Sequence, residues 1–248
     1  MKTLILAGGK GTRFMEESKH MPKPMIPING KPMIFYIMEH YNSFGFTDFV
    51  ILGGTKVDYI INYFNNNFSK LSNDKDKYLI SNEMNVQILD TGEETMTGGR
   101  VKRAIDELSL EQFMLTYGDG LSDVNINNSI EFHKKNNKLI TVTAVHPIAR
   151  FGELDINSKG NVINFKEKPQ TFNGWINGGY FVVKREFIDL IDNEQTILEK
   201  DPLEKAVQMK QLSAFKHEGF WQCMDTKRDK DKLEEIYKSK FVPWLNSG

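Results

Sequence analysis

The chain has 248 residues, a formal net charge of −1 and a single cysteine. A chain of this length can bury a sizeable core, and α/β proteins of this size often form one domain. The nearly neutral charge argues against a nucleic-acid partner, which normally requires a strong basic excess. One cysteine allows no internal disulfide, and no apolar run approaches the roughly 20 residues of a membrane helix. We therefore expect a cytoplasmic protein with no membrane segment and no signal peptide.

A buried strand followed by a glycine-rich turn opens the chain. Four apolar residues at 4–7 predict a strand buried on both faces, and glycines follow at positions 8, 9 and 11. Glycine lets the backbone approach a ligand, and consecutive N–H groups in such a turn form a concavity for anions. Arg13 and Lys23 add two cations suited to phosphate. We interpret the segment as a polyphosphate-binding loop; the alternative is a tight turn with scattered surface charges.

Two common phosphate-binding motifs do not match this turn. The dinucleotide fingerprint G-x-G-x-x-G requires a third glycine where the chain has Phe14. The Walker A motif requires Ser or Thr directly after Gly-Lys, and neither Gly9-Lys10 nor Gly30-Lys31 is followed by one. A nicotinamide oxidoreductase and a P-loop nucleotidase are therefore disfavoured.

Strands and helices alternate through the first half of the chain. Helices are expected at 32–44, 56–64, 100–108 and 126–136, and strands at 48–52, 85–90, 112–117 and 139–146. This alternation predicts a parallel sheet with right-handed crossovers. Residues 65–77 are rich in Asn, Asp, Lys and Ser, and they are expected to form a solvated loop.

The pattern changes after Pro147 to shorter strands that indicate mixed or antiparallel pairing. Strands are expected at 151–156, 161–167, 176–183, 211–216 and 220–224, and helices at about 185–192, 201–210 and 226–240. The charges of the last helix are interpreted as a solvated face.

Two aspartates follow expected strands. Asp119 stands between glycines directly after strand 112–117, at the sheet edge where ligands gather in open parallel sheets. That edge also carries the Arg13 loop, so Asp119 is a metal-ligand candidate rather than a turn residue. Asp225 precedes the last helix, and the sequence alone favours an ordinary N-cap there, by Asp225 or by Thr226.

Several motifs together resemble the sugar-phosphate nucleotidyltransferases. Residues 6–13 and the Pro-Lys-Pro at 22–24 resemble the signature of that family. The match narrows to its glucose-1-phosphate cytidylyltransferase branch through Thr-Met-Thr-Gly-Gly-Arg at 95–100, Tyr-Gly-Asp-Gly at 117–120, Arg-Phe-Gly at 150–152, Glu-Lys-Pro at 167–169, Asn-Gly-Gly at 177–179, Phe-Trp-Gln at 220–222 and Met-Asp-Thr at 224–226. The resemblance covers nearly the whole chain.

The resemblance implies the fold and its division. We expect an α/β, Rossmann-like three-layer fold with a mostly parallel central sheet and a smaller mixed sheet on the acceptor side. One nucleotidyltransferase domain would span 1–248, with a nucleotide-binding part at about 1–146 and a sugar-phosphate-binding part at about 147–248.

The resemblance also implies a set of site residues. The nucleotide-binding residues would be Leu6, Ala7, Gly8, Gly9, Lys10, Gly11, Thr12, Arg13, Lys23, Thr95, Gly98, Gly99, Arg100 and Gly118, with Arg13 and Lys23 as the catalytic cations. The sugar phosphate would contact Gly152, Glu167, Lys168, Asn177 and Gly178, and Asp119 and Asp225 would hold Mg²⁺. Without the resemblance, Gly98-Gly99 indicates an ordinary loop, and the residues at strand ends indicate turns or bulges as readily as ligand contacts.

The implied reaction joins CTP and glucose 1-phosphate to give CDP-glucose and pyrophosphate in a homo-oligomeric enzyme of deoxysugar and surface polysaccharide synthesis. The attacking phosphate oxygen is already ionised near pH 7, because the second pKa of such groups is about 6, so no general base is required. One alternative keeps this chemistry and changes the acceptor to another sugar phosphate or small phosphomonoester. An alternative of another class is a non-catalytic nucleotide-binding regulator.

Overall fold

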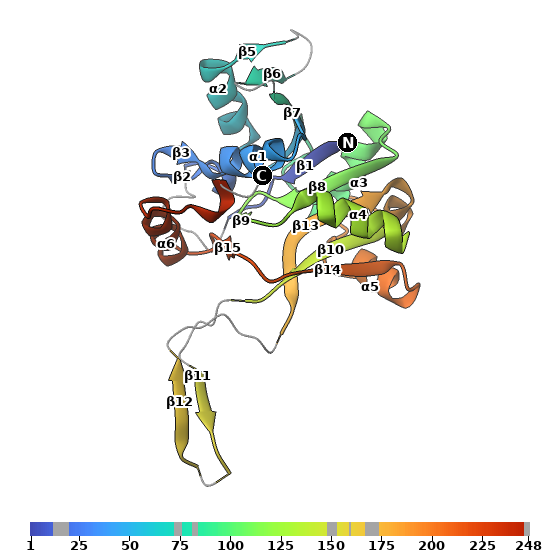
Figure 1. Cartoon of the computed structure of the whole chain (residues 1–248). Helices are drawn as coiled ribbons and strands as arrows, with labels where there is room; N and C mark the ends of the chain where they lie inside the picture. The colour runs from blue at the N-terminus through green and yellow to red at the C-terminus, as the bar shows by residue number, and fades with distance from the viewer. Residues whose placement is uncertain are drawn as a thin grey trace.

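The computed structural model describes residues 1–11, 20–71, 76–80, 84–147, 153–158, 160–166 and 174–245. Nine strands form its central sheet: β1 (Lys2–Leu6), β4 (Asp48–Gly53), β5 (Ser69–Lys70), β6 (Lys77–Ile80), β7 (Met84–Asp90), β8 (Gln112–Tyr117), β10 (Ile140–Val145), β13 (Ile176–Lys184) and β14 (Leu212–His217). Their order is β14-β10-β13-β8-β1-β4-β7-β6-β5 (Figure 1). The strands point in one direction except β6 and β13, which run antiparallel to both neighbours. The prediction of an α/β fold with a mostly parallel sheet is confirmed.

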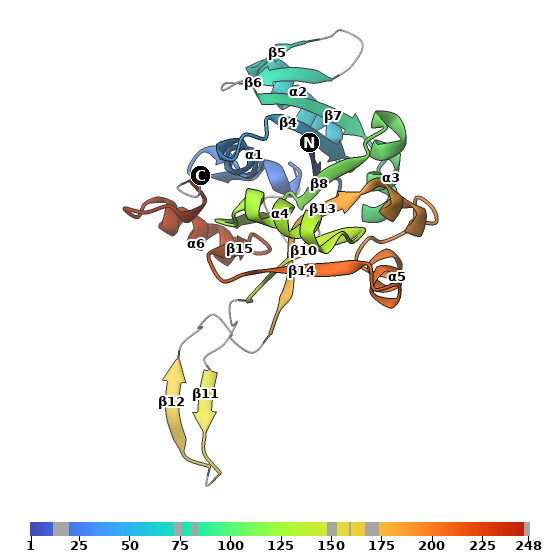
Figure 2. The same ribbon diagram turned by 45° about the vertical axis from the view of Figure 1, so that its right-hand side comes forward.

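Helices cover both faces of the sheet (Figure 2). Each face buries its own apolar core. The helices α1 (Met33–Ser43), α2 (Val57–Asn67), α4 (Ile126–Asn136) and α6 (Lys227–Tyr237) pack on one face, and α3 (Thr97–Leu108) and α5 (Asp201–Gln208) pack on the other. Within β1, Leu4 belongs to one core and Ile5 to the other, and both are fully buried. Strands covered on both faces have continuous apolar sequences, which is why this strand was recognisable. The predicted three-layer arrangement is confirmed.

Strands from the second half of the chain form the mixed end of the sheet. β13 lies antiparallel between β8 and β10, while β14 is parallel to β10 at the edge. Among the described residues, three two-stranded ladders lie outside the sheet: β2 (Pro27–Ile28) with β3 (Lys31–Pro32), β9 (Gly120–Ser122) with β15 (Trp221–Cys223), and β11 (Glu153–Ile156) with β12 (Val162–Lys166). The β11–β12 hairpin stands apart from the rest of the molecule in both views (Figure 1, Figure 2). The β9–β15 ladder joins the two halves of the chain beside the site described below.

The expected loop over 65–77 is wrong in part, and its residues 72–75 lie outside the described residues. α2 continues to Asn67, and the short strand β5 pairs with β6 at the edge of the sheet. Phe68 packs against the apolar core and Tyr78 is fully buried, whereas Asn65 to Asn67 are exposed. Polar residues therefore lie on the exposed side of a helix end and of an edge strand of the sheet. Their polar composition alone predicts a loop.

The start of α3 and the type of the segment at 185–192 also differ from the expectations. α3 begins at Thr97, three residues before the expected start, and the segment expected as a helix at 185–192 is a 3₁₀ segment, η4 (Arg185–Leu190). Within the described ranges, no helix combines the length and apolar character needed to cross a bilayer.

Two buried histidines give the fold an expected acid sensitivity. Burial lowers the pKa of His40 and of His133 to about 4. His40 Nε2 donates to Val124 O at 2.9 Å, and His133 Nδ1 shares a hydrogen bond with Thr141 Oγ1 at 2.8 Å. The unfolded chain binds protons at its histidines near the ordinary pKa of about 6.5, whereas these two stay neutral in the folded state until about pH 4. We therefore expect the free energy of unfolding to fall as the pH is lowered from about 6.5 to about 4.

Urea titrations at pH 7 and pH 4.5 on wild type and on His40→Asn measure this effect. The variant loses one of the two shifted groups, so its stability should decrease less between the two pH values. Equal decreases in both proteins would contradict the assignment.

Candidate active site

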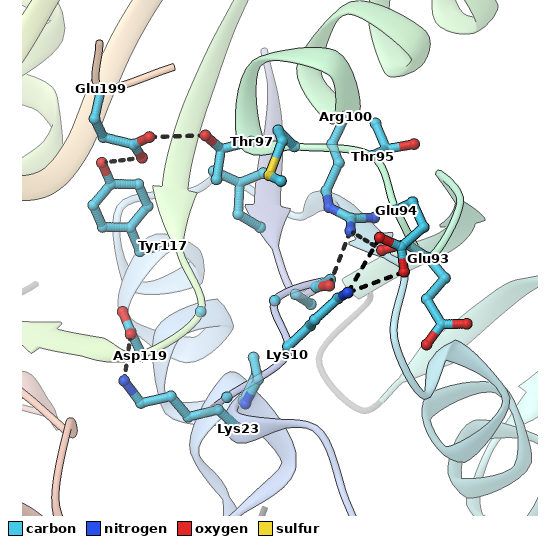
Figure 3. A pocket seen from close by; sticks show the side chains of 18 of the residues that line it. Lys10, Lys23, Glu93, Glu94, Thr95, Thr97, Arg100, Tyr117, Asp119 and Glu199 are labelled. Carbon is cyan, nitrogen blue, oxygen red and sulfur yellow. Dashed lines mark hydrogen bonds and ion pairs between the residues drawn. The ribbon is translucent and has the colours of Figure 1, made fainter. Parts of the chain in front are cut away.

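A cavity of about 520 Å³ lies at the carboxyl ends of β1, β7 and β8 (Figure 3). This is the edge at which ligands bind in open parallel sheets, and the volume suits a small-molecule ligand. Ten of the residues expected to bind nucleotide line it: Leu6, Ala7, Gly8, Gly9, Lys10, Gly11, Lys23, Thr95, Arg100 and Gly118. Thr12 and Arg13 lie outside the described residues, so their expected contacts stay predictions.

The loop after β1 forms one wall of this cavity. Gly11 has a φ of +63°, a conformation that glycine adopts without steric cost, and a Cβ on Gly9 would meet no other atom within 4 Å. The Lys10 Nζ lies 3.0 Å from Glu94 Oε1, so an ion pair between two exposed side chains links this loop to the one after β7. The glycine-rich segment thus presents accessible backbone to the cavity, as expected for a phosphate-binding turn.

Arg100 holds the loops of the cavity wall together. Its buried guanidinium donates hydrogen bonds to the carbonyl oxygens of Gly8 at 2.9 Å, Gly53 at 2.9 Å, Gly92 at 2.7 Å and Glu93 at 3.2 Å. These carbonyls belong to the chain segments that follow β1, β4 and β7, so one side chain fixes three strand ends. The guanidinium also fills the space that a Cβ on Gly8 would occupy, which explains why position 8 requires glycine.

Gly98 and Gly99 lie behind the cavity wall rather than in its lining. Gly98 N donates to Thr196 O at 3.0 Å, and a Cβ on Gly99 would stand 2.6 Å from Glu194 Cα. The close approach that requires glycine here is therefore to the backbone of the chain's own segment 193–198. The first turn of α3 is thus packed against protein, and the expected nucleotide contact of Gly98 and Gly99 stays a prediction.

We expect Gly99→Ala to lower the free energy of unfolding by about 2–4 kcal/mol, because the new methyl group must displace the Glu194 backbone. Gly9→Ala provides the matched control, since its methyl group meets open space and should change stability by less than about 0.5 kcal/mol. Urea denaturation of both variants measures the difference. Equal stability of the two proteins would contradict the packing role.

Close packing at Gly118 brings Lys23 to the end of β8. Gly118 N donates to Leu6 O at 3.1 Å, and a Cβ at this position would stand 2.6 Å from Pro24 Cγ. The short 3₁₀ segment η2 (Lys23–Met25) can therefore lie directly against the strand ends. As a result, Lys23 faces Asp119, the residue after Gly118 (Figure 3).

Lys23 joins the two expected metal carboxylates. Its Nζ donates to Asp119 Oδ2 at 2.7 Å and to Asp225 Oδ1, and its side chain is 13% exposed. Burial by itself lowers the pKa of Lys23, but the charge of Asp119 and the hydrogen bonds to both carboxylates outweigh it and raise this pKa above its ordinary value. The two carboxylates, which come from positions 106 residues apart, thus converge on one cation position.

The cap of α6 leaves the Asp225 side chain directed at that position. Thr226 is the N-cap: its hydroxyl accepts from Asp229 N, and the Asp229 carboxylate accepts in return from Thr226 N. Met224 N donates to Asp119 O at 2.8 Å, which extends the β9–β15 ladder and sets the two aspartates side by side. The N-cap interpretation of Asp225 is therefore wrong, and the neighbouring threonine performs that role.

A second cavity of about 240 Å³ adjoins the first. Tyr117, Asp119 and Asp225 line both cavities, so the paired carboxylates stand at their junction. Asn177 and Gly178, expected on the sugar-phosphate side, line the second cavity. Gly152, Glu167 and Lys168 lie outside the described residues, and their assignment stays a prediction.

Some lining residues were not among the expected site residues. The two cavities also include Glu93, Glu94, Thr97, Tyr117, Glu199, Trp221 and Cys223. Tyr117 could have been found, because it directly precedes the Gly118-Asp119 pair at a strand end. Glu199 could not, because it reaches the cavity only through the packing of its segment against α3, about 100 residues earlier in the chain.

A three-layer fold with a glycine loop, a lysine and two carboxylates at one sheet edge defines an α/β protein of the Rossmann-like class. The chain belongs to the nucleotidyl transferase family, whose family model matches residues 2–229. It is 45% identical to the glucose-1-phosphate cytidylyltransferase of Salmonella typhimurium, with 98% of each chain covered. It is 32% identical to the probable glucose-1-phosphate cytidylyltransferase of Bacillus subtilis, with 98% of this chain and 99% of that one covered.

A solved structure shares the fold as well. The crystal structure of HddC from Yersinia pseudotuberculosis complexed with GMP-PN superposes with a TM-score of 0.72 at 26% identity, and the match covers 96% of this chain and 99% of that one. The family resemblance inferred from the sequence motifs is thereby confirmed, as is the assignment to the nucleotidyltransferases.

Proposed function

We propose that the protein transfers a cytidylyl group from CTP to glucose 1-phosphate, giving CDP-glucose and pyrophosphate. The observation that carries the proposal is the junction of the two cavities, where Lys23, Asp119 and Asp225 meet. A reaction between two polyanions requires cationic groups at the point where the α-phosphorus meets the acceptor phosphate. The choice of CTP and glucose 1-phosphate is supported by the relatives of Salmonella and Bacillus.

The larger cavity would hold CTP and the smaller one the sugar phosphate. The loop of Gly8 to Gly11 offers backbone N–H groups to the phosphates, and Lys10 stands at the same wall. Arg13 would stabilise the departing pyrophosphate, and Lys23 would neutralise charge at the α-phosphate. On the acceptor side, Asn177 and Gly178 would contact the sugar phosphate together with Gly152, Glu167 and Lys168.

The residues at the junction also fit a divalent cation. Asp119 and Asp225 aim carboxylate oxygens at one cation position, and Mg²⁺ typically binds through one or two carboxylates plus substrate phosphates. We therefore propose Mg²⁺ as the cofactor of this enzyme. When bound, it supplies charge neutralisation for the reacting phosphates.

The acceptor phosphate would attack the α-phosphorus directly. Its oxygen is ionised near pH 7, so the protein's task is to align the two substrates and to reduce their repulsion. The new bond forms between the acceptor oxygen and the α-phosphorus while the bond to the pyrophosphate oxygen breaks. The protein therefore requires neither a general base nor a covalent intermediate.

The family resemblance also supports proposals about location, assembly and pathway. We infer a cytoplasmic homo-oligomer, with a nucleotide-binding part at about 1–146 and a sugar-phosphate-binding part at about 147–248. Its product would enter the synthesis of deoxysugars for lipopolysaccharide, O-antigen or capsule.

Pyrophosphate release tests the proposal. CTP, UTP, dTTP, ATP and GTP are each combined with a panel of sugar 1-phosphates, with Mg²⁺ and with EDTA in its place. We expect release with CTP and glucose 1-phosphate in the presence of Mg²⁺ only. Release with CTP and a different acceptor would replace the sugar assignment. No release with any pair, together with CTP binding in calorimetry, would favour a non-catalytic nucleotide-binding regulator.

A further inference from the structure

Glu199 is linked by hydrogen bonds to residues of both cavities (Figure 3). On one side its Oε2 accepts from Thr97 Oγ1 at 2.8 Å, in the first turn of α3. On the other side its Oε1 accepts from the hydroxyl of Tyr117 at 2.7 Å. The Tyr117 oxygen in turn accepts from Asn177 Nδ2 at 3.0 Å. We call this chain of four side chains the Glu199 relay.

The donors and acceptors of the Glu199 relay follow from their chemistry. An ionised carboxylate only accepts, so both hydroxyls must donate to Glu199. The phenol of Tyr117 is one of these donors, at 2.7 Å from Glu199 Oε1. The Tyr117 oxygen is then left as an acceptor, and Asn177 must turn its NH₂ group toward it. This orientation leaves Asn177 Oδ1 to accept from Gly179 N at 2.8 Å.

The backbone at Gly179, two residues after Asn177, packs closely against the ring of Tyr117. Gly179 has a φ of +81°, and a Cβ there would overlap the Tyr117 ring. Tyr117 is the last residue of β8 and stands two residues before Asp119. Asn177 lies on β13 and lines the second cavity. The relay therefore connects the end of β8 with the wall of the second cavity. The Glu199 carboxylate is therefore connected through Tyr117 to a residue of that wall.

We propose that Glu199 and Tyr117 are positioning residues. They hold Asn177, and with it the wall of the second cavity, at a fixed position relative to the nucleotide cavity. The inference rests on the proposed function, because it takes the second cavity as the acceptor site. Loss of the relay should weaken use of the sugar phosphate while leaving CTP binding intact. A direct contact of Glu199 with CTP would instead weaken CTP binding first.

Four variants and one control test the relay: Glu199→Ala, Glu199→Gln, Tyr117→Phe, the Glu199→Ala/Tyr117→Phe double variant, and Glu194→Ala. Glu194 lies in the same segment and pairs with Arg103 on α3 at 2.5 Å, so its variant removes an exposed carboxylate and an ion pair outside both cavities. The measurements are kcat, the KM of each substrate, and the Kd of CTP by calorimetry.

We expect Glu199→Ala and Tyr117→Phe each to raise the KM of glucose 1-phosphate roughly tenfold, with the Kd of CTP changed less than about twofold. Their effects should not add in the double variant, because either change breaks the same relay. Glu199→Gln should recover most of the loss, since its amide oxygen accepts from Tyr117 and its NH₂ group can donate to Thr97 Oγ1. Glu194→Ala should match wild type.

Other outcomes would overturn the relay. A CTP Kd that rises as much as the acceptor KM would make Glu199 a nucleotide contact. Additive losses in the double variant would mean that Glu199 and Tyr117 act independently. A fall in kcat alone, together with a lower melting temperature, would mean that these residues have only a structural role. Normal wild-type turnover with all variants equal to Glu194→Ala would overturn the relay alone, whereas a wild type without turnover would overturn the proposed function and the relay together.

Discussion

We expect Asp225→Asn to release pyrophosphate roughly 100- to 1,000-fold more slowly than wild type while remaining folded. An amide at this position removes one of the two negative charges that converge on the cation position beside the proposed α-phosphate site. Hard divalent cations bind charged oxygen ligands, so the Kd of the metal should rise as well. Folding should change little, because the cap of α6 is made by Thr226 and Asp229 rather than by Asp225.

Asp231→Asn is the matched control for this experiment. It makes the same change at an exposed position of α6, the helix that Asp225 precedes, and we expect wild-type rates. Asp119→Asn should reproduce the loss, since Asp119 supplies the other carboxylate. Pyrophosphate release is measured across a series of Mg²⁺ concentrations, with circular dichroism to verify folding. An Asp225→Asn rate within threefold of wild type would remove Asp225 from the metal site.

Periodicity and strand order were enough to predict where the site lies. Alternating strands and helices predict a parallel sheet, and the carboxyl ends of parallel strands share one edge. Asp119 and the glycine loop were expected at that edge, and both line the same cavity. Asp225 was not predictable in this way, because a polar residue before a helix is equally typical of an N-cap. Only the resemblance indicated its role, and the structure shows Thr226 as the cap.

The contacts that shape the cavity could not be predicted from local sequence. Gly98 and Gly99 stand in a loop motif, yet the atoms that require glycine there belong to residues 194–196. Glu199 has no neighbouring motif, and β5 has only two residues, which is too short for a periodicity signal. In each case the deciding partner is distant in sequence, so the information lies in the tertiary packing.

Lys23 occupies the position that a metal bound by Asp119 and Asp225 would require. Its ammonium lies within hydrogen-bonding distance of both carboxylates, so its single positive charge offsets one of their two negative charges. Two unit charges 4 Å apart interact by about 4 kcal/mol at an effective dielectric constant of 20, and a divalent cation would be repelled more strongly. Metal binding should therefore require Lys23 to turn away from the carboxylates, toward the cavity where the α-phosphate is proposed to lie.

Lys23→Met should separate the two roles of this side chain. Loss of the cation at the α-phosphate should lower turnover roughly 100- to 1,000-fold. Loss of the competing ammonium should at the same time tighten Mn²⁺ binding to the nucleotide-free protein by at least about tenfold, as measured by electron paramagnetic resonance. Two carboxylates left without Lys23 should also lower the melting temperature, and Mn²⁺ should restore it.

Lys31→Met provides the control, because Lys31 pairs with Glu39 outside the cavities and its loss should leave Mn²⁺ binding unchanged. Weaker Mn²⁺ binding in Lys23→Met would mean that the lysine supports the metal rather than competing with it. Unchanged Mn²⁺ binding with a normal melting temperature would mean that the carboxylates are not the metal ligands. Tighter binding combined with lost turnover is expected only if one ammonium first holds the metal position and then serves the phosphate.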